Sequence, residues 1–293
     1  MLLRVLPALL PLLSAAPAAA GSCPALFADG RAPVLTNPKL AERTRTLCFE
    51  AFAVLHSGVS RTPLYAAEHL TRAGIAAARR VARDDAFHDE DRLPPDQRAD
   101  LDDYVHSGFD RGHLAPAGDM PSEAAQGQSF SLANVVPQDR ALNRGLWAAI
   151  EESTRRLASR RGELFVVTGA VFEGGSVQSI KGRVLVPTRL FKAIYDPASG
   201  EAAAYLAPNR AEGGWQAVSL AALRDIAGLD AFPALPDRAK ATAMSLPEPR
   251  EFSRGDSAGR RPQGRDESWQ DWLGRELSRA LRKAFRDVLR AIF

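Results

Sequence analysis

The residues best suited to chemistry form two groups in the middle of the chain. The first group is the run Asp110-Arg111-Gly112-His113, which brings an acid, a guanidinium and an imidazole together. The second group begins at Asn134 and extends to Arg155. A neutral histidine can take a proton from water near neutral pH, and arginine binds phosphate oxygens in pairs. These residue types are suited to the hydrolysis of a phosphodiester bond.

Phosphodiester hydrolysis also requires the leaving oxygen to be neutralised, and a magnesium ion suits that task. Magnesium accepts oxygen ligands and keeps several of its waters. The carbonyl oxygen of one asparagine side chain, together with water, would hold it if the substrate phosphate supplied further ligands. A histidine beside an arginine usually has a structural role when no other catalytic residue types accompany the pair. The first group therefore predicts a catalytic site only together with the second group.

A helix is predicted over residues 143–161, and it positions part of the second group. Its polar face carries Asn143, Glu151 and Arg155, which recur at a spacing close to 3.6 residues per turn. The adjoining apolar face carries Leu146, Ile150 and Leu157. Such a helix can pack on a core with one side and present polar groups to a cleft with the other.

The remaining pattern predicts short strands joined by turns, which favours an antiparallel sheet. We expect an irregular arm over residues 21–50 and a short helix over residues 220–229. The expected strands cover residues 49–55, 63–70, 164–172, 180–186, 190–195 and 201–207.

Over roughly residues 48–236, these motifs together resemble the DNA/RNA non-specific endonuclease family, the ββα-metal nucleases that include endonuclease G. The resemblance implies an α+β fold in which helices flank a central antiparallel sheet that carries a ββα-metal active-site element. It rests on Asp110-Arg111-Gly112-His113-Leu114, Asn134, Pro137-Gln138, Asn143-Arg144-Gly145-Leu146-Trp147, Glu151, Arg155, Val166-Val167-Thr168-Gly169, Val171-Phe172, Val186-Pro187, Phe191-Lys192 and Pro208-Asn209.

The resemblance also implies a role for each matching residue. His113 would be the general base that acts on water, and Asn134 would help to orient the site near it. Asn143 would bind Mg²⁺ directly, with Mn²⁺ as a substitute, and Glu151 would hold a metal-bound water. The implied enzyme is a metal-dependent phosphodiester hydrolase.

Arginines complete the implied site. Arg111 and Arg155 would support the phosphate or the structure around it. The family also uses an arginine upstream of the central motif to stabilise the transition state, and Arg83 is our candidate, with Arg80 as the neighbouring alternative. The acidic segment that follows, residues 84–103, has no calcium-loop spacing, so we interpret it as a solvated loop rather than a carboxylate metal cage.

The resemblance implies that the substrates are DNA and RNA. A site that contacts mainly phosphate and sugar is expected to show little sequence preference. A net charge of +3 is compatible with a polyanionic partner but does not require one. The alternative is a catalytically weak, nuclease-like protein that binds nucleic acid. The presence of His113, Asn143, Glu151 and Arg155 argues against that alternative.

The N-terminal sequence predicts export. Residues 1–20 have the pattern of a secretory signal peptide, with Arg4 before a short apolar run and small residues at 18–20. We therefore expect a periplasmic or secreted protein. Cys23 and Cys48 are the two cysteines of the chain, and in an exported protein such a pair predicts a disulfide. That bond would staple an arm over residues 21–48 to a domain that covers residues 21–245.

The C-terminal sequence predicts two further segments. Residues 246–267 are rich in proline, glycine, serine and arginine and read as a flexible linker. Residues 268–293 form a basic amphipathic pattern, typical of a helix that packs on its own domain or on a second copy as a homodimer. The same helix could instead contact an inhibitor or an anionic membrane.

Overall fold

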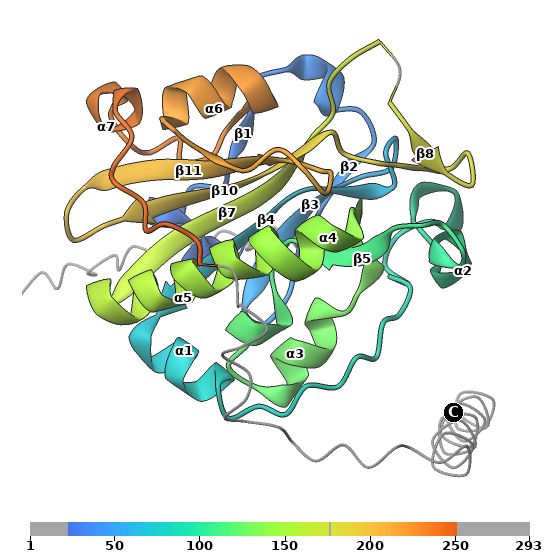
Figure 1. The fold of residues 1–293 in the computed structure, drawn as a ribbon, viewed down its shortest axis with the longest axis horizontal. Coiled ribbons are helices and arrows are strands. Elements are labelled where there is room, and N and C mark those ends of the chain that lie inside the picture. Colours follow the sequence, from blue (N-terminus) through green and yellow to red (C-terminus); the bar gives the residue numbers. More distant parts are fainter. Residues whose placement is uncertain (1–22, 176, 251–293) are drawn as a thin grey trace, which may run out of the picture. The chain divides into compact units, whose positions relative to one another are not determined.

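A seven-stranded antiparallel sheet forms the centre of the described domain (Figure 1), in the order β12-β11-β10-β7-β4-β3-β2. The structure is a computed structural model that describes residues 23–175 and 177–250. The strands are β2 (Thr44–Cys48), β3 (Phe52–Ser57), β4 (Thr62–Thr71), β7 (Glu163–Val171), β10 (Arg189–Asp196), β11 (Glu201–Pro208) and β12 (Gln216–Val218). With helices packed on the sheet, the α+β fold expected from the sequence is confirmed.

The central strand β7 lies between β4 and β10. Its register places Gly169 opposite Tyr65 on one side and Phe191 on the other. A Cβ atom at Gly169 would collide with the Phe191 ring and would lie 2.7 Å from the carbonyl oxygen of Leu64. Glycine is therefore required here for the two neighbouring strands to approach.

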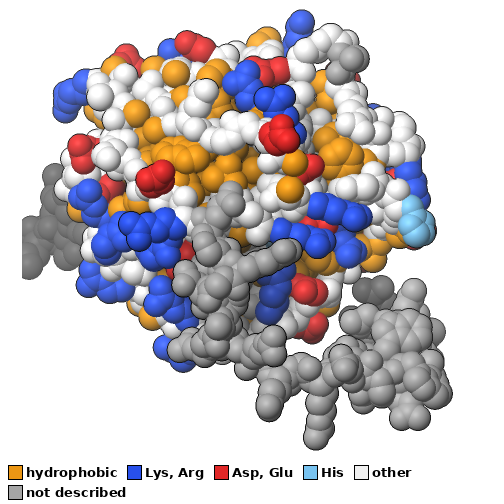
Figure 2. Space-filling model, in the orientation of Figure 1, with side chains coloured by type: hydrophobic (Ala, Val, Ile, Leu, Met, Phe, Trp, Pro, Cys, Tyr) orange, Lys and Arg blue, Asp and Glu red, His pale blue; other side chains and the backbone are white. Residues whose placement is uncertain are grey.

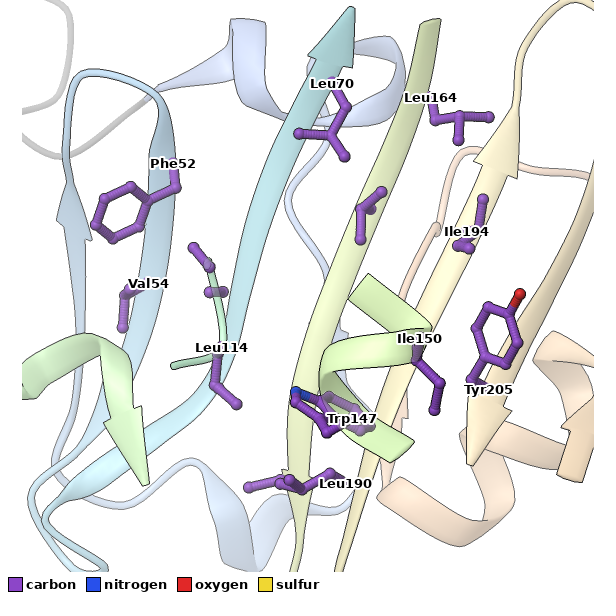
Figure 3. Packing of buried hydrophobic residues seen from close by; sticks show 14 of the residues in the cluster. Phe52, Val54, Leu70, Leu114, Trp147, Ile150, Leu164, Leu190, Ile194 and Tyr205 are labelled. Atoms are coloured by element: carbon purple, nitrogen blue, oxygen red, sulfur yellow. The ribbon is translucent and has the colours of Figure 1, made fainter. Parts of the chain in front are cut away.

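Two apolar cores lie on opposite faces of the sheet, because successive side chains of a strand point to opposite sides. On one face, Ile150 and Leu157 of α5 (Ala148–Arg161) pack with Ile75 of α1 (Arg72–Ala78) against the strands. Figure 3 shows Ile150 of this helix, and Trp147 just before it in the chain, directed onto the strands. Helix α6 (Leu220–Ala227) covers the opposite face.

The N-terminal arm is tied to the sheet at both ends. Cys23 and Cys48 form a disulfide, and β1 (Val34–Leu35) pairs antiparallel with β13 (Leu229–Asp230). The prediction of a wholly irregular arm over residues 21–50 is wrong, because Thr44–Cys48 forms the edge strand β2.

Two predicted strands have different limits in the structure. The strand expected over residues 49–55 begins at Phe52, because Phe49 N donates to Phe52 O at 2.9 Å and closes a turn. The strand expected over residues 180–186 is a small hairpin of β8 (Ser179–Ile180) and β9 (Val184–Leu185). Lys181 and Gly182 have φ values of 47° and 66° at its turn, so the chain reverses where the apolar pattern looked continuous.

The predicted signal peptide, the predicted C-terminal helix and most of the predicted linker lie outside the described residues. The first linker residues pack on the domain, since Leu246 belongs to the apolar core and the Tyr205 hydroxyl donates to Pro247 O at 2.6 Å. In the ranges that the structure describes, no helix is both long enough and apolar enough to cross a membrane.

Candidate active site

The two groups of candidate residues meet in a strand–strand–helix element. Strand β5 (Asp110–His113) pairs antiparallel with β6 (Val135–Gln138), and His113 lies opposite Val135. The chain then enters α4 (Arg140–Leu142), one π-helical turn (Asn143–Trp147) and α5. The helix thus starts three residues earlier than predicted, because the Asp139 carboxylate accepts hydrogen bonds from the backbone of Ala141 and Leu142.

Gly112 allows the close approach of β5 and β6. A Cβ atom at this position would collide with the side chain of Gln138, which lies on the facing strand. The glycine between Arg111 and His113 is therefore needed for packing, because it lets the strand that carries the histidine lie close to β6.

His113 is buried between two aromatic rings. Its ring centroid lies 5.2 Å from that of Phe87 and 5.0 Å from that of Phe130. Its Nε2 atom has no hydrogen-bond partner among the described residues. Burial lowers the pKa of His113 to about 3, and the positive charge of Arg83 acts in the same direction. The imidazole is therefore neutral near pH 7 and can accept a proton.

Asn143 is held by the acid that begins the central motif. Its Nδ2 donates to Asp110 Oδ2 at 3.0 Å, which leaves the side-chain carbonyl oxygen for a ligand. Asp110 also accepts from Arg144 Nε at 2.8 Å and from Arg144 Nη2 at 2.9 Å. Burial would raise the pKa of Asp110, but the hydrogen bonds from Arg144 and Asn143 keep that pKa below its usual value.

Glu151 lies two helical turns beyond Asn143 and is half-buried. Burial raises the pKa of its carboxyl, and the positive charges of Arg155 and Lys192 oppose that rise. Arg155 itself is ion-paired, with Nη1 at 2.8 Å from Asp119 Oδ1 and Nε at 2.9 Å from Glu152 Oε2. Because both contacts are to acids of the protein itself, Arg155 has a structural role next to Glu151 in this structure.

Asn134 clamps the backbone that follows His113. Its Oδ1 accepts from Ala115 N at 2.9 Å, while Nδ2 donates to Ala115 O at 2.8 Å and to Ser129 O at 2.9 Å. The side chain is fully buried. All its contacts are to backbone, so the geometry suits a residue that orients the histidine strand.

A cavity of about 550 Å³ opens beside these residues. Arg83, Arg111 and Asn143 line it, whereas Arg80 does not. The Arg111 guanidinium lies 4.3 Å from the centroid of the Phe87 ring. Arg83 Nε pairs with Asp85 Oδ1 at 2.6 Å, and the charge of Arg83 reaches His113. Of the two candidates for the upstream arginine, Arg83 lines this cavity and Arg80 does not, and the role of Arg83 stays a prediction.

Several residues of the site were missed in the sequence. Asp110 belongs to the central motif, but the sequence predicts no role for it, although a carboxylate next to Arg111 is a possible partner for polar groups of the helix. The contacts of Phe87 and Phe130 with His113 could not be predicted from the sequence, because only the tertiary fold brings these residues together. Asn209 holds β6, with its Oδ1 accepting from Asp139 N and its Nδ2 donating to Pro137 O.

The acidic segment over residues 84–103 builds no metal cage. Within residues 23–175 and 177–250, no group of three or more histidine, cysteine, aspartate or glutamate side chains is arranged to hold a metal ion. Buried acids of the acidic segment make structural contacts. Glu90, for example, forms an ion pair with Arg92 and accepts a hydrogen bond from the Ser131 hydroxyl.

Comparison with known proteins decides the family. Residues 33–238 match the model of the DNA/RNA non-specific endonuclease family, which is more than half of the chain. The chain belongs to the DNA/RNA non-specific endonuclease family. Members of this family are nucleases, which hydrolyse phosphodiester bonds, and metal dependence is typical of the group.

Named relatives agree with this assignment. The chain is 33% identical over 177 residues to Nuclease C1 of Cunninghamella echinulata var. echinulata, covering 55% of this chain and 70% of the relative. It is 32% identical over 216 residues to the human mitochondrial nuclease EXOG, covering 66% of this chain and 58% of the relative. The chain thus spans little more than half of that mitochondrial relative.

A solved structure shows the same fold. The crystal structure of an EndoG/EndoGI complex, described as showing the mechanism of EndoG inhibition, has a TM-score of 0.57 and 24% sequence identity. The match covers 68% of this chain and 89% of that chain. It supports the expected ββα-metal nuclease fold.

The relatives contradict the predicted location. Several of them are named as mitochondrial, including human EXOG and the endonuclease G of Caenorhabditis elegans. They point to mitochondria rather than to the periplasm or the medium, so the prediction of a periplasmic or secreted protein is wrong. That prediction rested on the pattern of residues 1–20, which lie outside the described residues.

Proposed function

We propose that this chain is an endonuclease that hydrolyses the phosphodiester bonds of DNA and RNA with the help of Mg²⁺. One observation carries the proposal: Asn143, whose amide nitrogen is bound by Asp110, lines a cavity together with Phe87, and the Phe87 ring contacts the neutral, buried His113. The histidine contacts Phe87, which lines the cavity together with Asn143. This connection through Phe87 supports a site in which a proton acceptor and an oxygen ligand act beside the arginines of the cavity.

The donor set fits magnesium. Asn143 offers one neutral oxygen, and Glu151 lies on the same helix face, where it can hold a metal-bound water. Such a sparse set leaves most of the coordination shell to water and phosphate, which magnesium prefers. When bound, Mg²⁺ would neutralise the charge that develops on the leaving oxygen. Mn²⁺ also takes oxygen ligands in octahedral geometry and would be a substitute.

The chain's own residues would supply the remaining chemistry. His113 would accept a proton from the attacking water, since its lowered pKa keeps the imidazole neutral. Arg83 and Arg111 would bind the phosphate oxygens, because both are exposed and line the cavity. Asp110 and Asn134 would hold Asn143 and the histidine strand in position.

The surface around the site suits a polyanion. Figure 2 shows lysine and arginine side chains gathered over the region of α4 and β5. Arg140 and Arg144 of this region line the cavity with Arg83 and Arg111. Contacts to phosphate carry no base sequence, so we expect cleavage of DNA and RNA at many sequences, with affinity that falls as salt rises.

Digestion of plasmid DNA and of RNA tests the proposal. The purified chain should degrade both in Mg²⁺ and neither in excess chelator, and Mn²⁺ should restore cutting. His113→Ala should abolish cutting, whereas His69→Ala, at a half-buried histidine paired with Glu163 outside the cavity, should not. Cutting that persists in chelator would refute the metal, and binding without turnover in every metal would indicate a nucleic-acid-binding protein.

Interactions of the C-terminal segment stay predictions. A homodimer, an inhibitor contact or a membrane contact through residues 268–293 would each involve residues outside the described ranges.

A further inference from the structure

A pair of exposed arginines lies just outside the active-site cavity. Helix α1 ends at Ala78, and Arg79 and Arg80 follow it in a turn. Ile75 and Ala78 of this helix are buried, so the helix is held on the core while the two arginines face solvent. Neither arginine lines the cavity. The pair is therefore a basic feature that the proposed chemistry does not use.

The positive charges of this pair are not compensated within the described fold. Neither Arg79 nor Arg80 forms an ion pair or a side-chain hydrogen bond with another described residue. The acids that follow in the chain do not bind them, since Asp85 pairs with Arg83 and Asp84 forms no ion pair in the described ranges. Two adjacent cations without partners raise the local concentration of anions.

The chain limits the distance from this pair to the cavity. Arg83 lies three residues beyond Arg80 and lines the cavity. The segment is anchored there, because Asp84 N donates to Gln126 Oε1 at 3.0 Å and the Arg83 guanidinium lies 5.6 Å from the centroid of the Phe130 ring. Three residues of fully extended chain span at most about 11 Å. The Cα atom of Arg80 therefore lies within about 11 Å of the Cα atom of Arg83.

That distance matches the spacing of phosphates along a nucleic acid. One strand of a duplex advances about 3.4 Å per nucleotide along its axis, so about 11 Å corresponds to about three nucleotides. A strand with one phosphate at Arg83 can therefore continue across Arg80 and Arg79. Figure 2 shows lysine and arginine side chains over α1 and the adjoining end of α5, in addition to those over α4 and β5.

We propose that Arg79 and Arg80 form a second phosphate-binding site, which holds nucleic acid about three nucleotides from the phosphate at Arg83. The proposal rests on the proposed function. Continuity with the cavity selects nucleic acid over other anions, because a polymer with evenly spaced phosphates can occupy both sites at once. Guanidinium groups bind phosphate oxygens in pairs and read no base, so the second site adds affinity without sequence specificity.

The second site affects which nucleic acids are held. Binding at two linked sites is stronger than binding at one. A long strand spans both sites, whereas a fragment shorter than about three nucleotides occupies only one of them. The pair thus favours the capture of long nucleic acid and the release of the shortest products.

The salt dependence of duplex binding, measured in excess chelator, tests the second site without relying on catalysis. Each phosphate that a protein cation neutralises contributes about −0.9 to the slope of log K against log salt concentration, where K is the association constant. For a labelled duplex of about 30 base pairs, Arg79→Gln/Arg80→Gln should make this slope shallower by about 1.8. Between about 50 and 200 mM salt, the parent should lose about 12-fold more affinity than the variant. Equal slopes for the variant and the parent would overturn the proposal.

Arg31→Gln/Arg238→Gln is the matched control. Both residues are exposed arginines that form no ion pair with another described residue. They belong to the N-terminal arm and to α7 (Asp237–Ala241), which pack on the face of the sheet opposite to α1. The control removes the same net charge and should keep the parent's slope. If both double variants make the slope shallower by the same amount, net charge alone causes the effect and the proposal is wrong. Melting curves check that both variants fold.

The two proposals fail in distinguishable ways. If the second site is wrong, plasmid and RNA are still cut in Mg²⁺, but the two double variants have the same slope. If the nuclease chemistry is wrong, nothing is cut, although Arg79→Gln/Arg80→Gln still binds the duplex with a shallower slope than the control.

Discussion

Asp110→Asn tests whether the first residue of the central motif positions the metal ligand. The variant keeps the side chain's size and one acceptor oxygen, but it removes the negative charge that Asn143 and Arg144 bind at 2.8 to 3.0 Å. The amide can also turn its own NH₂ group toward Asn143. The carbonyl oxygen of Asn143 would then lose its fixed direction.

The size of the effect follows from the hydrogen bond that changes. A hydrogen bond to a charged group contributes about 1.5–3 kcal/mol, and a neutral one contributes about 0.5–1.5 kcal/mol. The orientation of Asn143 should therefore lose about 1–2 kcal/mol, which is about 5- to 30-fold in metal affinity. Substitutions of residues that orient metal ligands usually cost about 10- to 100-fold, so the two figures overlap.

The assay is the initial rate of plasmid cutting as a function of Mg²⁺ concentration. Asp110→Asn should raise the Mg²⁺ concentration for half-maximal rate, and high Mg²⁺ should restore much of the rate. Asp230→Asn is the matched control, because Asp230 has similar exposure, 16% against 14%, and pairs with Lys240 in another part of the fold. An unchanged half-maximal concentration in Asp110→Asn would refute the positioning role.

Three further predictions concern protonation and stability. Since burial lowers the pKa of His113 to about 3, kcat/KM should show no acidic limb at the ordinary histidine value of 6.5, and a pH–rate profile with a limb there would contradict the buried, neutral imidazole. Glu68 is fully buried with both carboxylate oxygens unpartnered among the described residues, and burial raises its pKa well above the usual value. Stability should therefore be fully retained below the unfolded pKa and fall as pH rises toward the folded pKa, by at most about 1.4 kcal/mol per pH unit. In urea titrations at several pH values, Glu68→Gln should remove this decrease in the free energy of unfolding with pH. The same pH dependence in the variant and the parent would show that Glu68 is not its source. Replacing both Cys23 and Cys48 by alanine should lower the free energy of unfolding by about 3.5 kcal/mol for a separation of 25 residues, and a change below about 1 kcal/mol would show that the arm is held by β1 and β13 instead.

The sequence predicted the parts of the site whose spacing is local. Asn143, Glu151 and Arg155 repeat at helical intervals, so their shared face follows from periodicity, and the family resemblance linked that face to His113. The helix start was misplaced because the π-helical turn at Asn143–Trp147 and the cap at Asp139 are features of hydrogen bonding that apolar periodicity does not record.

Contacts between segments that are distant in the chain could not be predicted from the sequence. The bond between Asp110 and Asn143 spans 33 positions and depends on the pairing of β5 with β6. The aromatic rings around His113 come from the acidic segment and from the end of α3 (Glu123–Ser129). Strand β2 also escaped prediction, because two of its five residues are exposed and it lies at the edge of the sheet.

The central claim is that His113 acts on water while Asn143 holds the metal. Its most direct test is the Mg²⁺ dependence of plasmid cutting by the parent, His113→Ala and Asn143→Ala proteins, side by side. His113→Ala should lower the maximal rate about 100- to 10,000-fold at an unchanged half-maximal Mg²⁺ concentration, whereas Asn143→Ala should raise that concentration. A His113→Ala protein that cuts within tenfold of the parent rate, or an Asn143→Ala protein with the parent's Mg²⁺ dependence, would contradict it.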